Sequence, residues 1–117
     1  MAVAVHVVTS DAALQKALTA RLERSPRVVM TSHLDPFNRT GIVVTPASEC
    51  EIERCAKLAA RGLTVIILAA IPRPLEQERY LRAGAAAYVP MTIDSELLLA
   101  EIDREIDQVD GATPGGG

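Results

Sequence analysis

Hydroxyl and carboxylate residues follow two apolar runs of the sequence, at positions where they could hold an anion or a metal ion. Thr9, Ser10 and Asp11 come directly after the first run, and Thr45 ends a later one. Such hydroxyls can donate hydrogen bonds to a phosphate or accept a phosphoryl group from a serine/threonine kinase. Polar side chains at these points more often cap the next turn or helix. Both interpretations stay open at this point.

Cysteine and histidine offer further candidate sites, and each favours a structural role. Cys55 and Arg61 have the spacing of phosphatases with a cysteine nucleophile, but the stretch between them is rich in alanine and lacks a glycine-rich phosphate loop. Cys50 and Cys55 lie too close in one expected helix for a disulfide framework or a four-ligand zinc site. His6 and His33 are isolated from other metal ligands. We therefore expect reduced, buried cysteines, no metal and no cofactor.

The composition excludes several classes of function. A chain of 117 residues with 49 % apolar residues is long enough for one core and too short for two. The net charge is −3, from 12 basic and 15 acidic residues without a dense basic stripe, so we expect no direct nucleic-acid binding. The longest apolar stretch, residues 63–71, is far shorter than the roughly 20 residues that cross a bilayer. Residues 1–8 lack a basic leader, and we expect a cytoplasmic protein.

Apolar periodicity predicts strands that alternate with helices. The expected strands are residues 3–9, 27–32, 41–45, 63–69 and 86–90, and the expected helices begin near residues 11, 52, 74 and 95. This order predicts a three-layer α/β domain whose parallel sheet has the flavodoxin-like strand order 2-1-3-4-5. In such a sheet, ligand sites lie at the carboxyl ends of the first and third strands.

Two connections depart from a regular pattern. Residues 33–40 are too few for a normal covering helix, so we expect the second helix to be missing or cut to one turn. Its loss is expected to leave the sheet less covered near Val28 and Met30. The folded domain is expected to span residues 1–108, and the glycine-rich residues 109–117 are expected to form a flexible tail or a linker.

Two segments resemble the receiver domain of two-component response regulators. Residues 5–14 are similar to the first strand and helix cap of that family. Residues 83–90, Ala-Gly-Ala-Ala-Ala-Tyr-Val-Pro, followed by residues 94–100, are similar to its last strand and helix. The resemblance covers most of residues 3–107 and implies a bacterial signalling domain.

The resemblance also implies a chemistry that this sequence has lost. The family transfers a phosphoryl group to an aspartate with the help of Mg²⁺, an acidic pair, a hydroxyl residue and a lysine. The matching positions here hold Thr45 for the phosphoacceptor, Thr9 and Ser10 for the acidic pair, Ala69 for the hydroxyl residue and Met91 for the lysine. Only Asp11 keeps a neighbouring carboxylate, and we expect it to cap the first helix. Because Mg²⁺ is usually held through carboxylates and a threonine nucleophile needs a general base, we expect no metal site and no phosphorylation.

A recognition face is expected at the last two helices and the strand between them, where members of the family often dimerise. Ala86 and Ala87 replace the family's acidic residues and Glu101 replaces a basic one, so its ion-pair network cannot form. Leu97 precedes the buried Leu98 and should point toward solvent. A protein partner or a second copy is expected to bind a face made of Arg79, Arg82, Ala86, Ala87, Tyr88, Leu97, Glu101 and Arg104.

Three functions are compatible with these expectations. The first is a non-phosphorylatable pseudo-receiver that acts as a protein–protein interaction or regulatory module and not as an enzyme. The second is a small phospholigand-binding or enzymatic domain that uses the hydroxyls of Thr9, Ser10 and Thr45. The third is the N-terminal regulatory domain of a transcription factor whose DNA-binding part follows the glycine-rich end.

Overall fold

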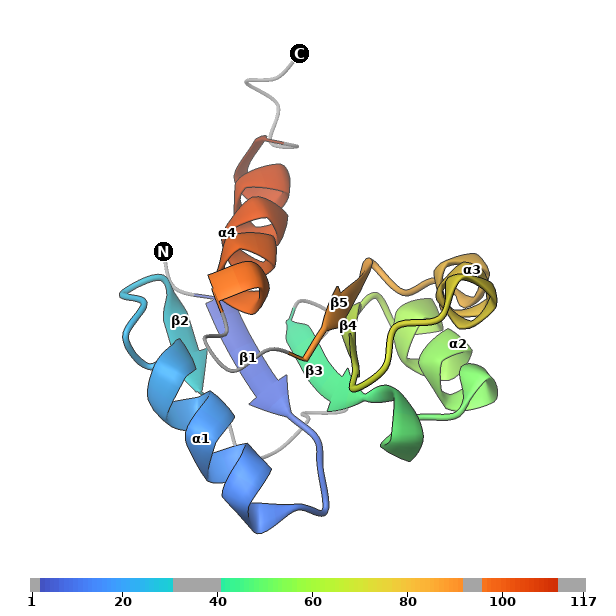
Figure 1. The fold of residues 1–117 in the computed structure, drawn as a ribbon. Helices are drawn as coiled ribbons and strands as arrows, with labels where there is room; N and C mark the ends of the chain where they lie inside the picture. The colour runs from blue at the N-terminus through green and yellow to red at the C-terminus, as the bar shows by residue number, and fades with distance from the viewer. Residues whose placement is uncertain (1–2, 31–40, 92–95, 112–117) are drawn as a thin grey trace.

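A five-stranded parallel sheet forms the centre of the molecule (Figure 1). The computed structural model describes residues 3–30, 41–91 and 96–111, with the side chains of the last helix described as far as Asp107. The strands are β1 (Val3–Val7), β2 (Val28–Met30), β3 (Ile42–Pro46), β4 (Thr64–Ala69) and β5 (Ala87–Pro90). Their order is β2-β1-β3-β4-β5, which confirms the predicted flavodoxin-like topology.

Four α-helices and one 3-10 helix are described around this sheet. They are α1 (Ala12–Leu22), η1 (Ala47–Glu49), α2 (Ile52–Ala60), α3 (Pro74–Ala83) and α4 (Glu96–Gly111). The predicted cap of α1 is confirmed, because the Asp11 carboxylate accepts a hydrogen bond of 3.1 Å from the backbone N–H of Leu14. Gly84 ends α3 with a φ of 114°, a left-handed conformation that favours glycine.

The helices cover both faces of the sheet (Figure 1). On one face, α1 and α4 bury Leu22 and Ile102 against even-numbered residues of β3 and β4, such as Ile66. On the other face, α2 and α3 bury Cys55 and Tyr80 against odd-numbered residues. Odd-numbered and even-numbered residues of β3 and β4 are therefore mostly apolar, as is typical of a parallel sheet with helices on both faces.

Strand β2 is left partly uncovered near Val28 and Met30, as expected, but the exposed side chain is that of Val29 between them. Val28 is buried and Met30 packs against the α1–α4 core, whereas Val29 is exposed. The physical reason is strand alternation: Val28 and Met30 point to the face covered by α1, and Val29 points to the opposite face. The predicted loss of the second helix falls on residues 31–40, outside the described residues.

The last helix runs to Gly111, past residue 108 where the folded domain was expected to end. Residues 112–117, part of the expected tail, lie outside the described residues. Within the described part of the chain, no helix combines the length and the apolar character needed to span a membrane.

Candidate functional site at the carboxyl edge of the sheet

A carboxylate bridges the residues that follow β1, at the edge where the family holds its metal ion. Thr9 donates a hydrogen bond from Oγ1 to Oε2 of Glu49. Ser10 donates to Oε1 of Glu49 from both its backbone N–H and its Oγ, each at 2.5 Å. Three donors therefore share one carboxylate, and we call this arrangement the Glu49 bridge. These hydrogen bonds, led by that of the Ser10 side chain, lower the pKa of Glu49 below its ordinary value because they stabilise the anion.

The position of Glu49 depends on the turn after β3. Pro46 ends the strand, and η1 carries the chain back across the sheet edge so that Glu49 reaches the β1–α1 connection. Tyr80, on α3, stabilises this turn, because its hydroxyl donates to the carbonyl oxygens of Ala47 at 3.0 Å and Cys50 at 2.5 Å. Burial raises the pKa of Tyr80 to about 12, so the phenol keeps the proton that makes these bonds.

Thr45, which the resemblance matches to the phosphoacceptor, is separated from solvent. Only 1 % of the residue is exposed, and its Oγ1 has no hydrogen-bond partner among the described residues. In β3 it follows Val43, which packs in the core under α2 and α3, so alternation places the Thr45 side chain on that same face. The structure therefore brings Thr9 and Ser10 together but gives no hydrogen bond that joins Thr45 to them.

The remaining positions that the resemblance matches to the family's site carry neither a hydroxyl group nor an amine. Ala69 is buried, and its carbonyl oxygen accepts a hydrogen bond of 2.8 Å from the backbone N–H of Met91. The Met91 side chain packs against the α1–α4 core. Asp11 is occupied as the cap of α1, and its N–H donates to Thr9 Oγ1 at 3.1 Å. No group of three or more His, Cys, Asp or Glu side chains that could hold a metal ion is found among the described residues.

Glu49 is the residue that sequence reasoning missed. Its three hydrogen bonds reach residues about 40 positions earlier in the chain, so no local pattern identifies them. The available signal was a carboxylate placed three residues after the proline that ends β3. A 3-10 turn at that point returns the side chain toward the strand edge.

The cysteines and histidines behave as small structural side chains where they are described. Cys50 and Cys55 are both free and buried. Burial raises the pKa of the Cys55 thiol, which disfavours the nucleophilic thiolate. His6 is half-buried in β1, and His33 lies outside the described residues.

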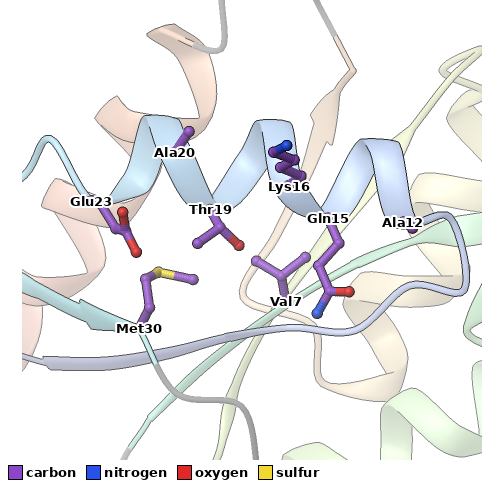
Figure 2. A pocket seen from close by; sticks show the side chains of 8 residues that line it. All are labelled: Val7, Ala12, Gln15, Lys16, Thr19, Ala20, Glu23 and Met30. Atoms are coloured by element: carbon purple, nitrogen blue, oxygen red, sulfur yellow. The ribbon is translucent and has the colours of Figure 1, made fainter.

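A hollow of about 650 Å³ lies beside α1, on the side of β2 (Figure 2). Val7 and Met30 form its apolar floor, while Gln15, Thr19 and Glu23 approach from the helix. These side chains include no nucleophile paired with a general base, and the hollow is open to solvent. The hollow therefore does not have the arrangement of a reaction centre.

The expected recognition face is exposed only in part. Leu97 is 52 % exposed, which confirms that it points toward solvent. Ala87 is buried, so its expected place on the surface is wrong: in β5 it alternates with Tyr88 and points, like Val89, into the α1–α4 core. Ala86 is half-buried.

The charged members of that face lie on α3 and α4. Arg104 forms an ion pair of 2.7 Å with Glu101, and Arg82 forms one of 2.5 Å with Glu78. Arg79 is exposed on α3. The Arg82–Glu78 pair is exposed and therefore contributes little to stability, whereas Glu101 in the other pair is largely buried.

Tyr88 is held against α3 by its ring and by its hydroxyl. The ring stacks on Tyr80 with centroids 6.1 Å apart. The hydroxyl donates to Oε1 of Glu76 at 2.6 Å and accepts the backbone N–H of Arg73 at 3.2 Å. Burial, and then the hydrogen bond to Glu76, raises the pKa of Tyr88. Tyr88 thus ties β5 to the start of α3.

Comparisons with known proteins identify the fold. Neither a scan against protein-family models nor a search of curated proteins finds a match. Among solved structures, a response regulator from Thermotoga maritima superposes with a TM-score of 0.76 and 17 % identity, over 92 % of this chain and 99 % of that one. The signal receiver domain of NarL from Mycobacterium tuberculosis superposes with a TM-score of 0.70 and 16 % identity, over 88 % of this chain and 95 % of that one.

A third match bears a different description. A pilus assembly-related protein from Burkholderia pseudomallei superposes with a TM-score of 0.69 and 16 % identity, over 91 % of this chain and 87 % of that one. At these identities the likeness concerns the fold and not the residues of the site. The chain has the fold of a response-regulator receiver domain.

Proposed function

We propose that this chain is a receiver-like signalling module that binds a protein partner without being phosphorylated on aspartate. The observation that carries the proposal is the Glu49 bridge. A carboxylate from η1 satisfies the hydroxyls of Thr9 and Ser10, at the positions where the family places its acidic pair. The two loops that a metal ion connects in the family are here connected by hydrogen bonds.

The other positions support the same conclusion. Thr45 has no carboxylate to accept a phosphoryl group, and its hydroxyl is buried. Ala69 and Met91 offer neither a hydroxyl nor an ammonium group to a phosphoryl oxygen. Each missing group removes a charge or a donor that phosphoryl transfer requires.

A phospholigand-binding or enzymatic role has less support. The donors at Thr9 and Ser10 already point to Glu49, so a bound anion would have to displace a carboxylate and then lie beside it. Two anions at that distance repel each other. A binding role in the cytoplasm of a bacterial cell is the simpler interpretation. The pilus assembly-related protein has the same fold although its description is not that of a response regulator.

The proposed partner contact is the face formed by α3, β5 and α4. Leu97 supplies an exposed apolar side chain, and Arg79, Arg82 and Arg104 lie on the two helices that border β5. Apolar side chains with arginines around them are typical of protein–protein interfaces. The occupant is a protein partner or a second copy of the chain.

Incubation with acetyl phosphate and Mg²⁺ tests the loss of phosphorylation. Intact-mass measurement should show no phosphorylated species, because the chain has no carboxylate at position 45 to accept the group. A receiver domain with an intact aspartate, treated in the same tube, serves as the positive control. A phosphate adduct on this chain would refute the proposal.

A further inference from the structure

Two exposed apolar side chains lie where β4 leads into α3, at the start of the helix that also carries Arg79 of the α3–β5–α4 face. Ile71 is 70 % exposed and Leu75 is 74 % exposed. Pro72 lies within this connection and Pro74 begins α3, so their rings restrict the backbone between the two side chains. Exposed apolar residues gathered at one place often mark a binding surface.

A groove of about 420 Å³ is lined by Leu75 and runs between the starts of α2 and α3. Its apolar wall is formed by Ile52 on α2 and by Pro74, Leu75 and Tyr80 on α3. We call this site the α2–α3 groove. It offers an apolar contact surface on one side of the exposed Ile71–Leu75 segment.

The charge at the α2–α3 groove is positive, although the chain as a whole has a net charge of −3. Arg73 and Arg79 line the groove, and neither guanidinium forms an ion pair within the described part of the chain. Glu76 is the one carboxylate of the lining, and it already accepts the hydroxyl proton of Tyr88. The groove therefore presents unpaired positive charge beside apolar surface.

We propose that the α2–α3 groove binds an acidic segment of a partner protein that also carries apolar side chains. Leu75 and Ile71 would contact the apolar side chains, and Arg73 and Arg79 would pair with the carboxylates. Arginine forms such pairs well because its planar guanidinium matches a carboxylate. A protein segment fits better than a nucleic acid, because aliphatic side chains, and not stacking aromatics, occupy the exposed positions.

Tyr88 acts as a positioning residue for this site. Its hydroxyl bonds to the backbone of Arg73 and to the Glu76 carboxylate, which fixes the connection that presents Leu75. Removing the hydroxyl in Tyr88→Phe should lower the affinity of the groove about two- to fivefold without removing any direct contact. Retention of the full affinity in Tyr88→Phe would remove Tyr88 from the proposal.

Fluorescence anisotropy with short labelled peptides tests the binding. A peptide of glutamate and leucine should bind the full chain, and the matching lysine and leucine peptide should bind at least about tenfold more weakly. Leu75→Ser and Arg79→Glu should each weaken the acidic peptide about tenfold. Leu81→Ser is the matched control, since Leu81 is an exposed leucine of the same helix that lines a separate hollow.

Three results would overturn the proposal: no binding of the acidic peptide, equal binding of both peptides, or an equal loss in Leu81→Ser and Leu75→Ser. Displacement of the acidic peptide by a single-stranded oligonucleotide would show that the groove selects nucleic acid instead. The proposal is independent of the phosphorylation test, because the α2–α3 groove includes none of the residues at the degenerate site.

Discussion

A hydroxyl group is costly to bury without a hydrogen-bond partner, and the Thr45 side chain buries one at the end of β3. Replacing it by the isosteric valine in Thr45→Val should therefore raise the free energy of unfolding by about 1–2 kcal/mol, as measured by urea denaturation. Val43→Thr is the matched control, because Val43 is buried on the same face of the same strand, and it should lower stability by a similar amount. A loss of stability in Thr45→Val would mean that its hydroxyl has a partner.

The Glu49 bridge gives stability a pH dependence of defined sign. The pKa of Glu49 is lowered in the folded state, so its contribution is present above the ordinary pKa of a glutamate and is lost as the pH falls through the folded value. Glu49→Gln should be less stable than the wild type at about pH 7, and the difference should shrink toward about pH 3. Urea unfolding at both pH values measures it. A difference that stays constant between the two would contradict an ionised Glu49 bridge.

Glu105 should give stability a pH dependence of the opposite sign to that of Glu49. It is buried on α4, and burial, followed by the hydrogen bond with Glu101, raises its pKa. A raised pKa favours folding below the ordinary value of the carboxyl, and this contribution is lost as the pH rises through the folded value. Glu105→Gln should therefore be more stable than the wild type at about pH 7 and lose that advantage in acid. A Glu105→Gln variant that is less stable than the wild type at the higher pH would contradict this assignment.

At the scale of the elements, the contact between α2 and α3 depends on a glycine. A Cβ atom added at Gly84 would lie 2.6 Å from the Cβ of Ala59, and φ at Gly84 is +114°. Gly84→Ala should destabilise the domain by about 2 kcal/mol or more, because both the clash and the backbone conformation oppose it. Gly41→Ala is the control: its nearest neighbours lie at 3.5 and 3.7 Å, which is ordinary contact. Equal stability of the two variants would show that α2 and α3 can separate without cost.

The elements themselves were predictable because their signals are local. Asp11 and Gly84 mark a helix start and a helix end by residue type, and the spacing of Leu98 and Ile102 marks the buried side of α4. The Glu49 bridge was not predictable, since it joins loops that only the finished sheet brings together. The wrong facing of Ala87 arose in a strand of four residues, which is too short to show a clear alternation.

At the scale of the whole molecule, the proposed α3–β5–α4 face predicts how association responds to a surface charge. Leu97→Glu should abolish binding of the partner or of a second copy, while the free energy of unfolding changes by only about 0.5 kcal/mol. Analytical ultracentrifugation measures self-association, and thermal unfolding checks the fold. Val29→Glu, at an exposed position of β2 on the opposite edge of the sheet from β5, is the control for added charge. Association that is unchanged in Leu97→Glu would place the interface elsewhere.

The proposed function requires that the hydrogen bonds of the Glu49 bridge join the β1–α1 connection to η1 at the place where a metal ion and a phosphoryl group bind in the family. Amide NMR spectra recorded during titration with Mg²⁺ and beryllofluoride, a mimic of the phosphoryl group, test it most directly. The signals of Ser10, Glu49 and Met91 should not move, because the donors of the β1–α1 connection remain on Glu49 and no carboxylate stands at position 45. Saturable shifts of those signals would contradict it.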